Sequence, residues 1–149
     1  MDLLTLASAL SIGLLAGVEL AVGAALGPIL NGLGDATLEA RTRGATELGR
    51  VMPLAYGVVL VLAALTLLTA PEDARPWLFA AMAVFIAAGA LTVGFLVPIN
   101  VRVGRWDPQR PPADWRSQLR RWDRGHTARI VLLVATFALT LLALPAALA

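Results

Sequence analysis

Cysteine and lysine are absent from this 149-residue chain, and histidine occurs once. The lack of cysteine excludes disulfides, iron–sulfur clusters, thiolate zinc sites and cysteine nucleophiles. It also excludes the thiol–quinone oxidoreductases, another group of small four-helix membrane proteins. With His126 alone, one protomer cannot build a bis-histidine haem or a multi-histidine metal site. The residues therefore predict no cofactor within a single protomer.

Charged residues are also scarce. They make up 15% of the chain, against 58% hydrophobic residues, whereas a soluble domain carries roughly a quarter charged residues. The length allows one domain, residues 1–149, so the excess apolar surface predicts contact with a lipid bilayer. A sequence pI of about 10.4 would also fit a nucleic-acid binder. However, the arginines stand in loops beside apolar segments, which is typical of membrane topology, so nucleic acid is excluded as a partner.

Four apolar segments are long enough to cross a bilayer, which takes roughly 20 helical residues. They cover about residues 3–30, 51–70, 77–99 and 130–149, and only Glu19 interrupts the first. Inside lipid, separate apolar segments must satisfy their backbone hydrogen bonds internally, so each is expected to be a helix. The sequence predicts an all-α fold, a bundle of four transmembrane helices.

The first apolar segment could be read as a secretory signal peptide. It begins with Met1 and Asp2 rather than with basic residues, and it is longer than a signal sequence and contains a carboxylate. We therefore expect it to be retained as the first transmembrane helix.

The arginines predict the orientation of the bundle. The first loop with the start of the second span carries three, the second loop one and the third loop eight. Because basic residues mark cytoplasmic loops, eleven against one places loops 1 and 3 in the cytoplasm and both termini outside. The arginine- and alanine-rich composition further suggests a multi-pass protein of the bacterial inner (plasma) membrane.

The third loop is expected to lead into an interfacial cytoplasmic helix that continues into the fourth span. Pro112 is well placed as the first residue of this helix, which we expect to extend to about Ala143. Five residues recur at spacings of four, three, four and three and so share one helical face. They are Trp115, Leu119, Trp122, His126 and Arg129.

Glu19 is the most informative single residue. A carboxyl group inside a membrane span costs at least a few kcal/mol, so a functional or partnering role is expected. Its helical face carries Ala16, Gly23 and Gly27, which are small enough for close helix packing or for a ligand. Two interpretations stay open: a site residue, or a structural ion pair with an arginine of a neighbouring helix.

His126 and Arg129 lie one turn apart at the start of the fourth span. An ordinary hydrogen-bonded histidine at the membrane interface would explain His126. The neighbouring arginine also allows a chemical role, because such a pair can move a proton and stabilise an anion, as enolate or phenolate chemistry requires. Trp122 shares this face and is a candidate for contact with a substrate.

Two further polar residues have both structural and functional interpretations. Asn100 follows Pro98 at the end of the third span, where its amide could cap the helix or donate to a substrate oxygen. Arg43, Glu47 and Arg50 have the spacing of a helical ion-pair ladder. Arg50 would nevertheless point toward the same end of the bundle as His126.

Four sequence blocks resemble one known family. They are Gly17-Val-Glu19 running to Pro28, "GRVMP" at 49–53, "VPIN" at 97–100 and "RWDRGHTAR" at 121–129. In order and spacing they resemble the anthrone oxygenase-like family of small bacterial and fungal membrane proteins, formerly a domain of unknown function. The resemblance implies oxidation of an anthrone to an anthraquinone by dioxygen, without an obvious metal or flavin. It nominates Glu19, Asn100, His126 and Arg129 as site residues. Many bacterial members have no established substrate, so the resemblance transfers fold and site better than reaction.

These observations lead to one preferred hypothesis. His126 or Glu19 would act as the base and Arg129, with Asn100, as the anion stabiliser, on a lipophilic anthrone- or quinol-like substrate. Trp122, Arg50 and Gly23 are the candidate substrate-binding residues. The pocket is expected to open toward the cytoplasmic leaflet.

Two alternatives stay open. A metal or haem could use Glu19 and His126, with Asn100 and with Met52 or Met82, and a homo-oligomer could double the ligands. A non-enzymatic lipid or small-molecule binder, or a subunit of a membrane complex, would explain the small residues without a catalytic base.

Overall fold

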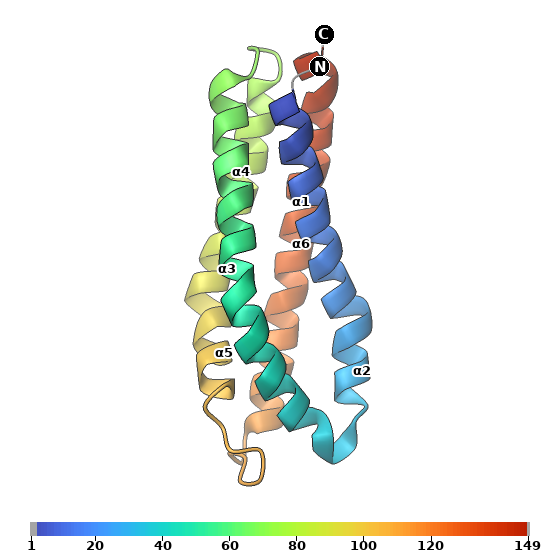
Figure 1. The fold of residues 1–149 in the computed structure, drawn as a ribbon, viewed down its shortest axis with the longest axis vertical. Coiled ribbons are helices and arrows are strands. Elements are labelled where there is room, and N and C mark those ends of the chain that lie inside the picture. The colour runs from blue at the N-terminus through green and yellow to red at the C-terminus, as the bar shows by residue number, and fades with distance from the viewer. Residues whose placement is uncertain (1–2, 149) are drawn as a thin grey trace.

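Each of the four apolar segments forms a long helix in the computed structural model, which describes residues 3–148 (Figure 1). The first runs over α1 (Leu3–Ala21), η1 (Val22–Leu26) and α2 (Gly27–Asn31), followed by the short η2 (Gly34–Ala36). The second is α3 (Thr37–Thr69), the third is α4 (Arg75–Leu91), η3 (Thr92–Leu96) and α5 (Val97–Val103), and the fourth is α6 (Trp115–Leu148). All four are long and apolar enough to cross a membrane, and the described residues contain no strand. The predicted all-α fold is confirmed.

Four helix boundaries differ from the prediction, one of them the end of α6, which lies at Leu148 rather than at about Ala143. α3 begins at Thr37 rather than at residue 51, the third helix continues past residue 99 to Val103, and α6 begins at Trp115 rather than at Pro112. Hydropathy detects only the apolar part of a helix. The polar first turns of α3 are rich in alanine, glutamate and arginine, which have high helix propensity, so the helix continues beyond the apolar segment.

The predicted ion-pair ladder of Arg43, Glu47 and Arg50 is wrong, because these turns form two separate salt bridges. Arg43 pairs with Glu39 at 2.9 Å, and Arg50 pairs with Glu47 at 3.2 Å. Glu47 therefore does not bridge the two arginines. Both pairs are exposed to solvent, where such pairs contribute little to stability.

Two of the four helices contain a π-helical turn. In η1 the amide of Gly27 donates to the carbonyl of Val22, and in η3 the amide of Val97 donates to Thr92. A proline, Pro28 or Pro98, is the second residue after each turn. Because proline has no N–H to donate, the helical hydrogen-bond pattern is already interrupted at these points. Such turns often occur at functional sites.

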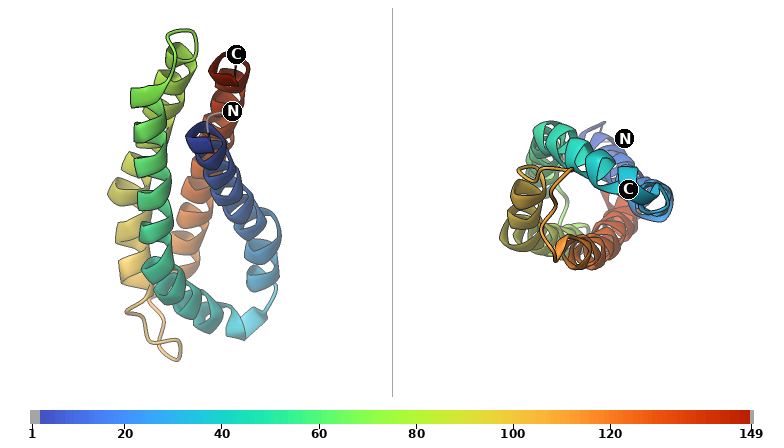
Figure 2. Two further views of the ribbon diagram at one scale, coloured as in Figure 1. Left: turned by 45° about the horizontal axis from the view of Figure 1, so that its top comes forward. Right: turned by 90° about the horizontal axis from the view of Figure 1, so that it is seen from below.

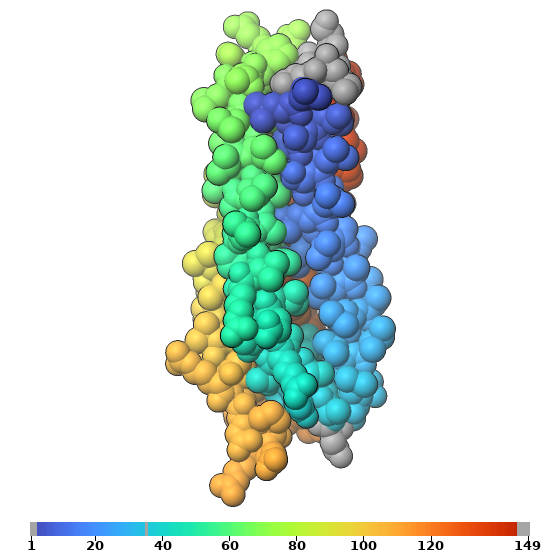
Figure 3. Space-filling model, viewed as in Figure 1, coloured from blue at the N-terminus to red at the C-terminus, as the bar shows by residue number. Residues whose placement is uncertain are grey.

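The helices alternate in direction, so both ends of the chain lie at one end of the bundle (Figure 1). Residues 32–36 and 104–114 lie at the other end, here called the arginine-rich end, where the loop of 104–114 projects (Figure 3). Seen from there, the first turns of α3 cross toward α2 (Figure 2). The core along the bundle includes Ile12, Val59, Phe85 and Leu133. Large apolar side chains such as Leu14 and Leu54 face outward, as contact with lipid requires.

Candidate functional site

A buried carboxylate joins three helices inside the bundle. Glu19 of α1 is 2% exposed. Its Oε2 accepts a hydrogen bond from Nη2 of Arg129 on α6 at 2.6 Å, and its Oε1 accepts one from the hydroxyl of Tyr56 on α3 at 3.0 Å. Both carboxylate oxygens are therefore satisfied, and the charge of Glu19 faces that of Arg129. This is the arrangement in which a buried charge is tolerated.

His126 completes this cluster from one turn earlier on α6. Its Nδ1 lies 2.9 Å from Nη2 of Arg129 and 3.4 Å from Oε2 of Glu19. With its hydrogen on Nε2 the neutral ring accepts a hydrogen bond from Arg129 at Nδ1. A hydrogen on Nδ1 would instead face the Nη2 donor of Arg129 at 2.9 Å. Nδ1 is therefore best satisfied as an acceptor from Arg129. Nε2 is buried and has no partner among the described residues.

The two π-helical turns border the cluster. Gly23 of η1 lies against the imidazole: a Cβ built on it would come within 3.3 Å of His126 Nε2 and 2.5 Å of Ile130. On the other side, Thr92 of η3 lies 3.5 Å from Nη1 of Arg129, measured to its hydroxyl oxygen. The lack of a side chain at Gly23 therefore gives the histidine its space.

Trp122 connects the cluster to a second ion pair nearer the arginine-rich end. Its ring stacks on that of His126, with centroids 4.7 Å apart and planes at 12°. The guanidinium carbon of Arg41 lies 5.6 Å from the Trp122 ring centroid, within cation–π range. The shared helical face predicted for Trp122, His126 and Arg129 is thus buried against neighbouring helices.

The second ion pair joins α3 to α6. Nη2 of Arg41 lies 2.9 Å from Oδ1 of Asp123 and donates to Oδ1 of Asn31 at the same distance. Nδ2 of Asn31 also approaches Oδ2 of Asp123 at 3.4 Å. These three residues link α2, α3 and α6 by hydrogen bonds and an ion pair at the arginine-rich end.

Comparison with known families identifies the chain. A family model described as anthrone oxygenase matches residues 42–139, more than half of the sequence. The chain belongs to the anthrone oxygenase family. No curated protein and no solved structure matches it.

The region matched by the anthrone oxygenase model contains only part of the polar network. Tyr56, His126 and Arg129 lie within it, whereas Glu19 and Gly23 precede it. The first block of the resemblance, from Gly17 to Pro28, is therefore outside the match, although the fold brings Glu19 against Arg129.

Two predicted site residues do not join this cluster. Arg50 has a side chain that is 70% exposed and pairs with Glu47. The side chain of Asn100 makes no hydrogen bond to the described residues, and its backbone carbonyl accepts from Gly104. Capping by the amide is also wrong, because α5 extends three residues past Asn100. Arg50 precedes Tyr56 by six residues on α3, and Asn100 follows Thr92 by eight residues on the third helix.

Five residues in these contacts were not predicted from the sequence as partners: Asn31, Arg41, Tyr56, Thr92 and Asp123. Tyr56 is the one tyrosine of the chain and lies in an otherwise apolar span, which is a usable signal. Asp123 lies three residues before His126 in the "RWDRGHTAR" block. For Arg41, no local feature distinguishes it from the other loop arginines.

The residues present do not fit a metal site in this anthrone oxygenase family member. Among the side chains that the structure describes, no three from histidine, aspartate or glutamate are grouped to hold an ion. Both oxygens of Glu19 already accept hydrogen bonds, and the Arg129 guanidinium beside them would repel a metal cation. Met82 lines a different gap, next to Thr136 and Thr140, at least ten residues along α6 from His126.

Proposed function

We propose that this member of the anthrone oxygenase family oxidises a lipophilic aromatic substrate, of the anthrone or hydroquinone type, with dioxygen. The observation that carries the proposal is the buried Nε2 of His126, which has no partner in the part of the chain that the structure describes. Buried polar atoms normally have a hydrogen-bond partner. Here the atom lies beside an ion pair that can hold a proton and a charge.

The substrate class follows from the chemistry of this location. A flat apolar molecule reaches a membrane-embedded site through lipid. An anthrone has an acidic carbon between aromatic rings, and a hydroquinone has acidic hydroxyls. Loss of a proton gives an electron-rich anion that can donate an electron directly to dioxygen.

The overall reactions balance without another reductant. With an anthrone, the CH₂ carbon loses two hydrogens and becomes a carbonyl, which takes one oxygen atom of dioxygen while the other leaves as water. With a hydroquinone, two hydrogens and two electrons pass to dioxygen and give a quinone and hydrogen peroxide.

His126 is proposed as the residue that contacts the substrate. With its hydrogen on Nδ1 and directed at Glu19, 3.4 Å away, the Nε2 lone pair can accept a proton from the substrate. This tautomer requires the Nη2 donor of Arg129, now 2.9 Å from Nδ1, to turn toward Glu19. The resulting Nε2–H can then donate to the anion, while the Glu19 carboxylate stabilises the imidazolium. One ring thus acts first as a base and then as an anion stabiliser.

Arg129 and Trp122 supply further contacts. Nε of Arg129 and Nε1 of Trp122 are also buried without a partner among the described side chains. With His126 they present polar atoms that a substrate with two oxygens could satisfy. The stacked Trp122 and His126 rings add a flat aromatic surface.

The test uses protein purified in detergent and supplied with a panel of anthrones and hydroquinones. Oxygen uptake and product absorbance are recorded for the wild type and for His126→Gln. Turnover is expected in the wild type, insensitive to a metal chelator and lost by roughly 10²-fold or more in the variant. Arg50→Gln, which removes an exposed arginine outside the cluster, is the control and should keep its activity. Absence of turnover across the panel, or equal turnover in His126→Gln, would contradict the proposal.

A non-catalytic binder of hydrophobic ligands is the second candidate. The observation in its favour is that both oxygens of Glu19 are already paired, as in a structural ion pair. This function predicts that an anthrone binds equally well to the wild type and to His126→Gln, with no oxygen consumed by either. Binding and oxygen uptake measured on the same samples separate the two candidates.

A further inference from the structure

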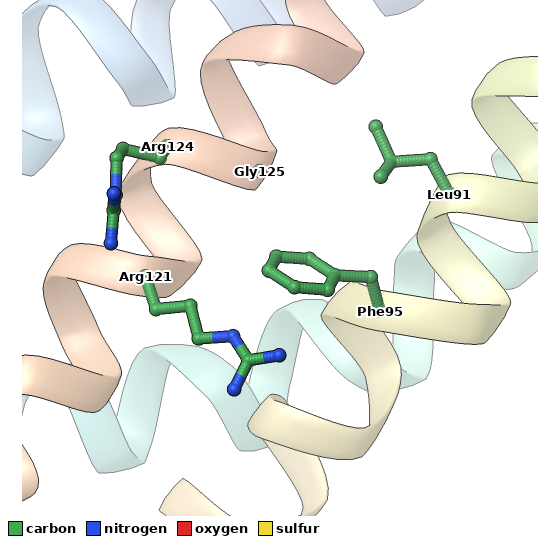
Figure 4. Close-up of a pocket in the computed structure, with 5 residues that line it drawn as sticks. All are labelled: Leu91, Phe95, Arg121, Arg124 and Gly125. Atoms are coloured by element: carbon green, nitrogen blue, oxygen red, sulfur yellow. The ribbon is translucent and has the colours of Figure 1, made fainter.

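A second candidate site lies on the outer face of the bundle, where α6 passes the third helix. A shallow, open pocket of about 390 Å³ is lined by Leu91, Phe95, Arg121, Arg124 and Gly125 (Figure 4). The proposed reaction uses none of these residues.

Two arginines without acidic partners form one side of this pocket. Arg121 and Arg124 are both exposed on α6. The guanidinium carbon of Arg121 lies 5.0 Å from the Phe95 ring centroid, and neither arginine forms a salt bridge with a described residue. The nearby carboxylate of Asp123 is paired with Arg41 instead. The two positive charges therefore remain available to an anion.

The opposite side is apolar and closely packed. Phe95 and Leu91 project from the third helix toward α6 (Figure 4). Gly125 is buried, and a Cβ built on it would come within 2.5 Å of the Phe95 ring. This glycine lets the ring lie directly on the α6 backbone. Leu91 is one turn farther from the arginine-rich end than Phe95, as Arg124 is relative to Arg121. The charged side therefore lies on α6 and the apolar side on the third helix (Figure 4).

We propose that this pocket binds an anionic phospholipid. The phosphate would lie between Arg121 and Arg124, and the adjoining part of the acyl chain would lie on Phe95 and Leu91. Guanidinium groups recognise phosphate through charge-assisted hydrogen bonds. Clusters of basic residues at the cytoplasmic membrane surface attract anionic lipid, and the arginine-rich end is predicted to be cytoplasmic. The open side admits a ligand arriving from the bilayer, and the apolar side distinguishes a lipid from free phosphate.

The test compares lipid binding by native mass spectrometry of the purified protein. Phosphatidylglycerol is expected to bind the wild type about tenfold or more tightly than phosphatidylcholine does. Arg121→Gln/Arg124→Gln should remove this preference, because about two favourable charge interactions are lost. Arg105→Gln/Arg110→Gln is the matched control. It removes two exposed arginines from the 104–114 loop and should keep the preference.

Three results would overturn the proposal: equal affinity for the two lipids in the wild type, an unchanged preference in the pocket variant, or an equal loss in the control. Displacement of phosphatidylglycerol by an equal concentration of glycerol phosphate would assign the arginines to soluble phosphate and would also overturn it. If the double variant does not purify, Arg124→Gln replaces it. The Arg124 side chain makes no hydrogen bond or ion pair with a described residue, so its replacement should not disturb the fold. The variant should lose part of the preference, because one of the two positive charges is removed.

Discussion

Glu19–Arg129 and Arg41–Asp123 are both carboxylate–guanidinium pairs between helices, but they differ in exposure to solvent. The side chains of Glu19 and Arg129 are 3% and 9% exposed, whereas those of Arg41 and Asp123 are 7% and 35% exposed. Each pair joins α6 to another helix, and each joins a residue within the matched family region to one that precedes it. Only in the Glu19–Arg129 pair, here called the inner pair, are both side chains buried; Arg41–Asp123 is called the outer pair.

This difference in exposure sets what each pair contributes. Removing one partner of a fully buried pair leaves an uncompensated charge, at a cost of about 3–5 kcal/mol. The partly hydrated Asp123 can regain water when its partner is lost, so the cost is closer to that of surface pairs, about 1 kcal/mol or less. The inner pair is therefore expected to contribute more to the free energy of unfolding than the outer pair. The outer pair is expected to join the helices at the arginine-rich end.

The largest effect is expected from Arg129→Leu, which leaves Glu19 buried and unpaired. The free energy of unfolding should fall by about 3–5 kcal/mol, measured by denaturant titration in mixed micelles. The double variant Glu19→Leu/Arg129→Leu should recover part of this loss, because neither charge remains. A single variant as stable as the wild type would remove the distinction between the two pairs.

Tyr56→Phe tests whether the inner pair depends on its hydroxyl donor. A hydrogen bond to a charged group contributes about 1.5–3 kcal/mol, and this variant deletes the one to Oε1 of Glu19 while keeping the ring beside Phe85. Stability should fall by that amount in the same titration. No change would mean that Glu19 finds another donor.

Gly23→Ala tests the space around the histidine. The added Cβ would meet Ile130 at 2.5 Å and His126 at 3.3 Å, and overpacking of this kind costs about 1–3 kcal/mol. Gly17→Ala on the same helix is the matched control, since nothing lies within 4 Å of a Cβ there. Thermal unfolding in detergent should separate the two variants, and equal midpoints would show that the histidine side of η1 is not tightly packed.

The smallest effect is expected from Arg41→Gln at the outer pair, because the Asp123 that remains is partly exposed and can regain water. Stability should fall by about 1 kcal/mol or less, and the difference from the wild type should shrink as salt is added, because this pair is partly screened. Measurement of both proteins at low and high salt provides the check. A loss as large as that of Arg129→Leu would show that the outer pair is as essential as the inner one.

Local patterns in the sequence were sufficient for much of the fold. Hydropathy located four helices, because a membrane-spanning segment must be apolar along its length. Helical spacing placed Trp122, His126 and Arg129 on one face. Hydropathy could not locate the start of α3 at Thr37, since its first turns are polar and depend on helix propensity instead. The orientation in the membrane stays a prediction from the arginine count.

Sequence patterns were not sufficient to predict which residues contact one another within the site. From the sequence, Glu19 could be either a site residue or one partner of a structural ion pair. The sequence also nominated Asn100 and Arg50 as site residues. Which residues meet depends on how far each helix is rotated and on which helices are neighbours, and a residue advances about 100° around its helix at every step. Arg50 lies six residues before Tyr56, and Asn100 eight residues after Thr92, so both are about two helical turns along the bundle from the cluster.

The sequence by itself determined that charges inside this membrane protein are few and that Glu19 and His126 needed partners there. This follows from the free energy of a charge in an apolar medium, which depends on composition and position alone. Only the tertiary structure decided that Arg129 and Tyr56 hold Glu19, and that Nε2 of His126 is left unpaired beside Gly23. Hydrogen bonds require particular atoms within about 3 Å of one another, and packing of helices distant in sequence sets those distances.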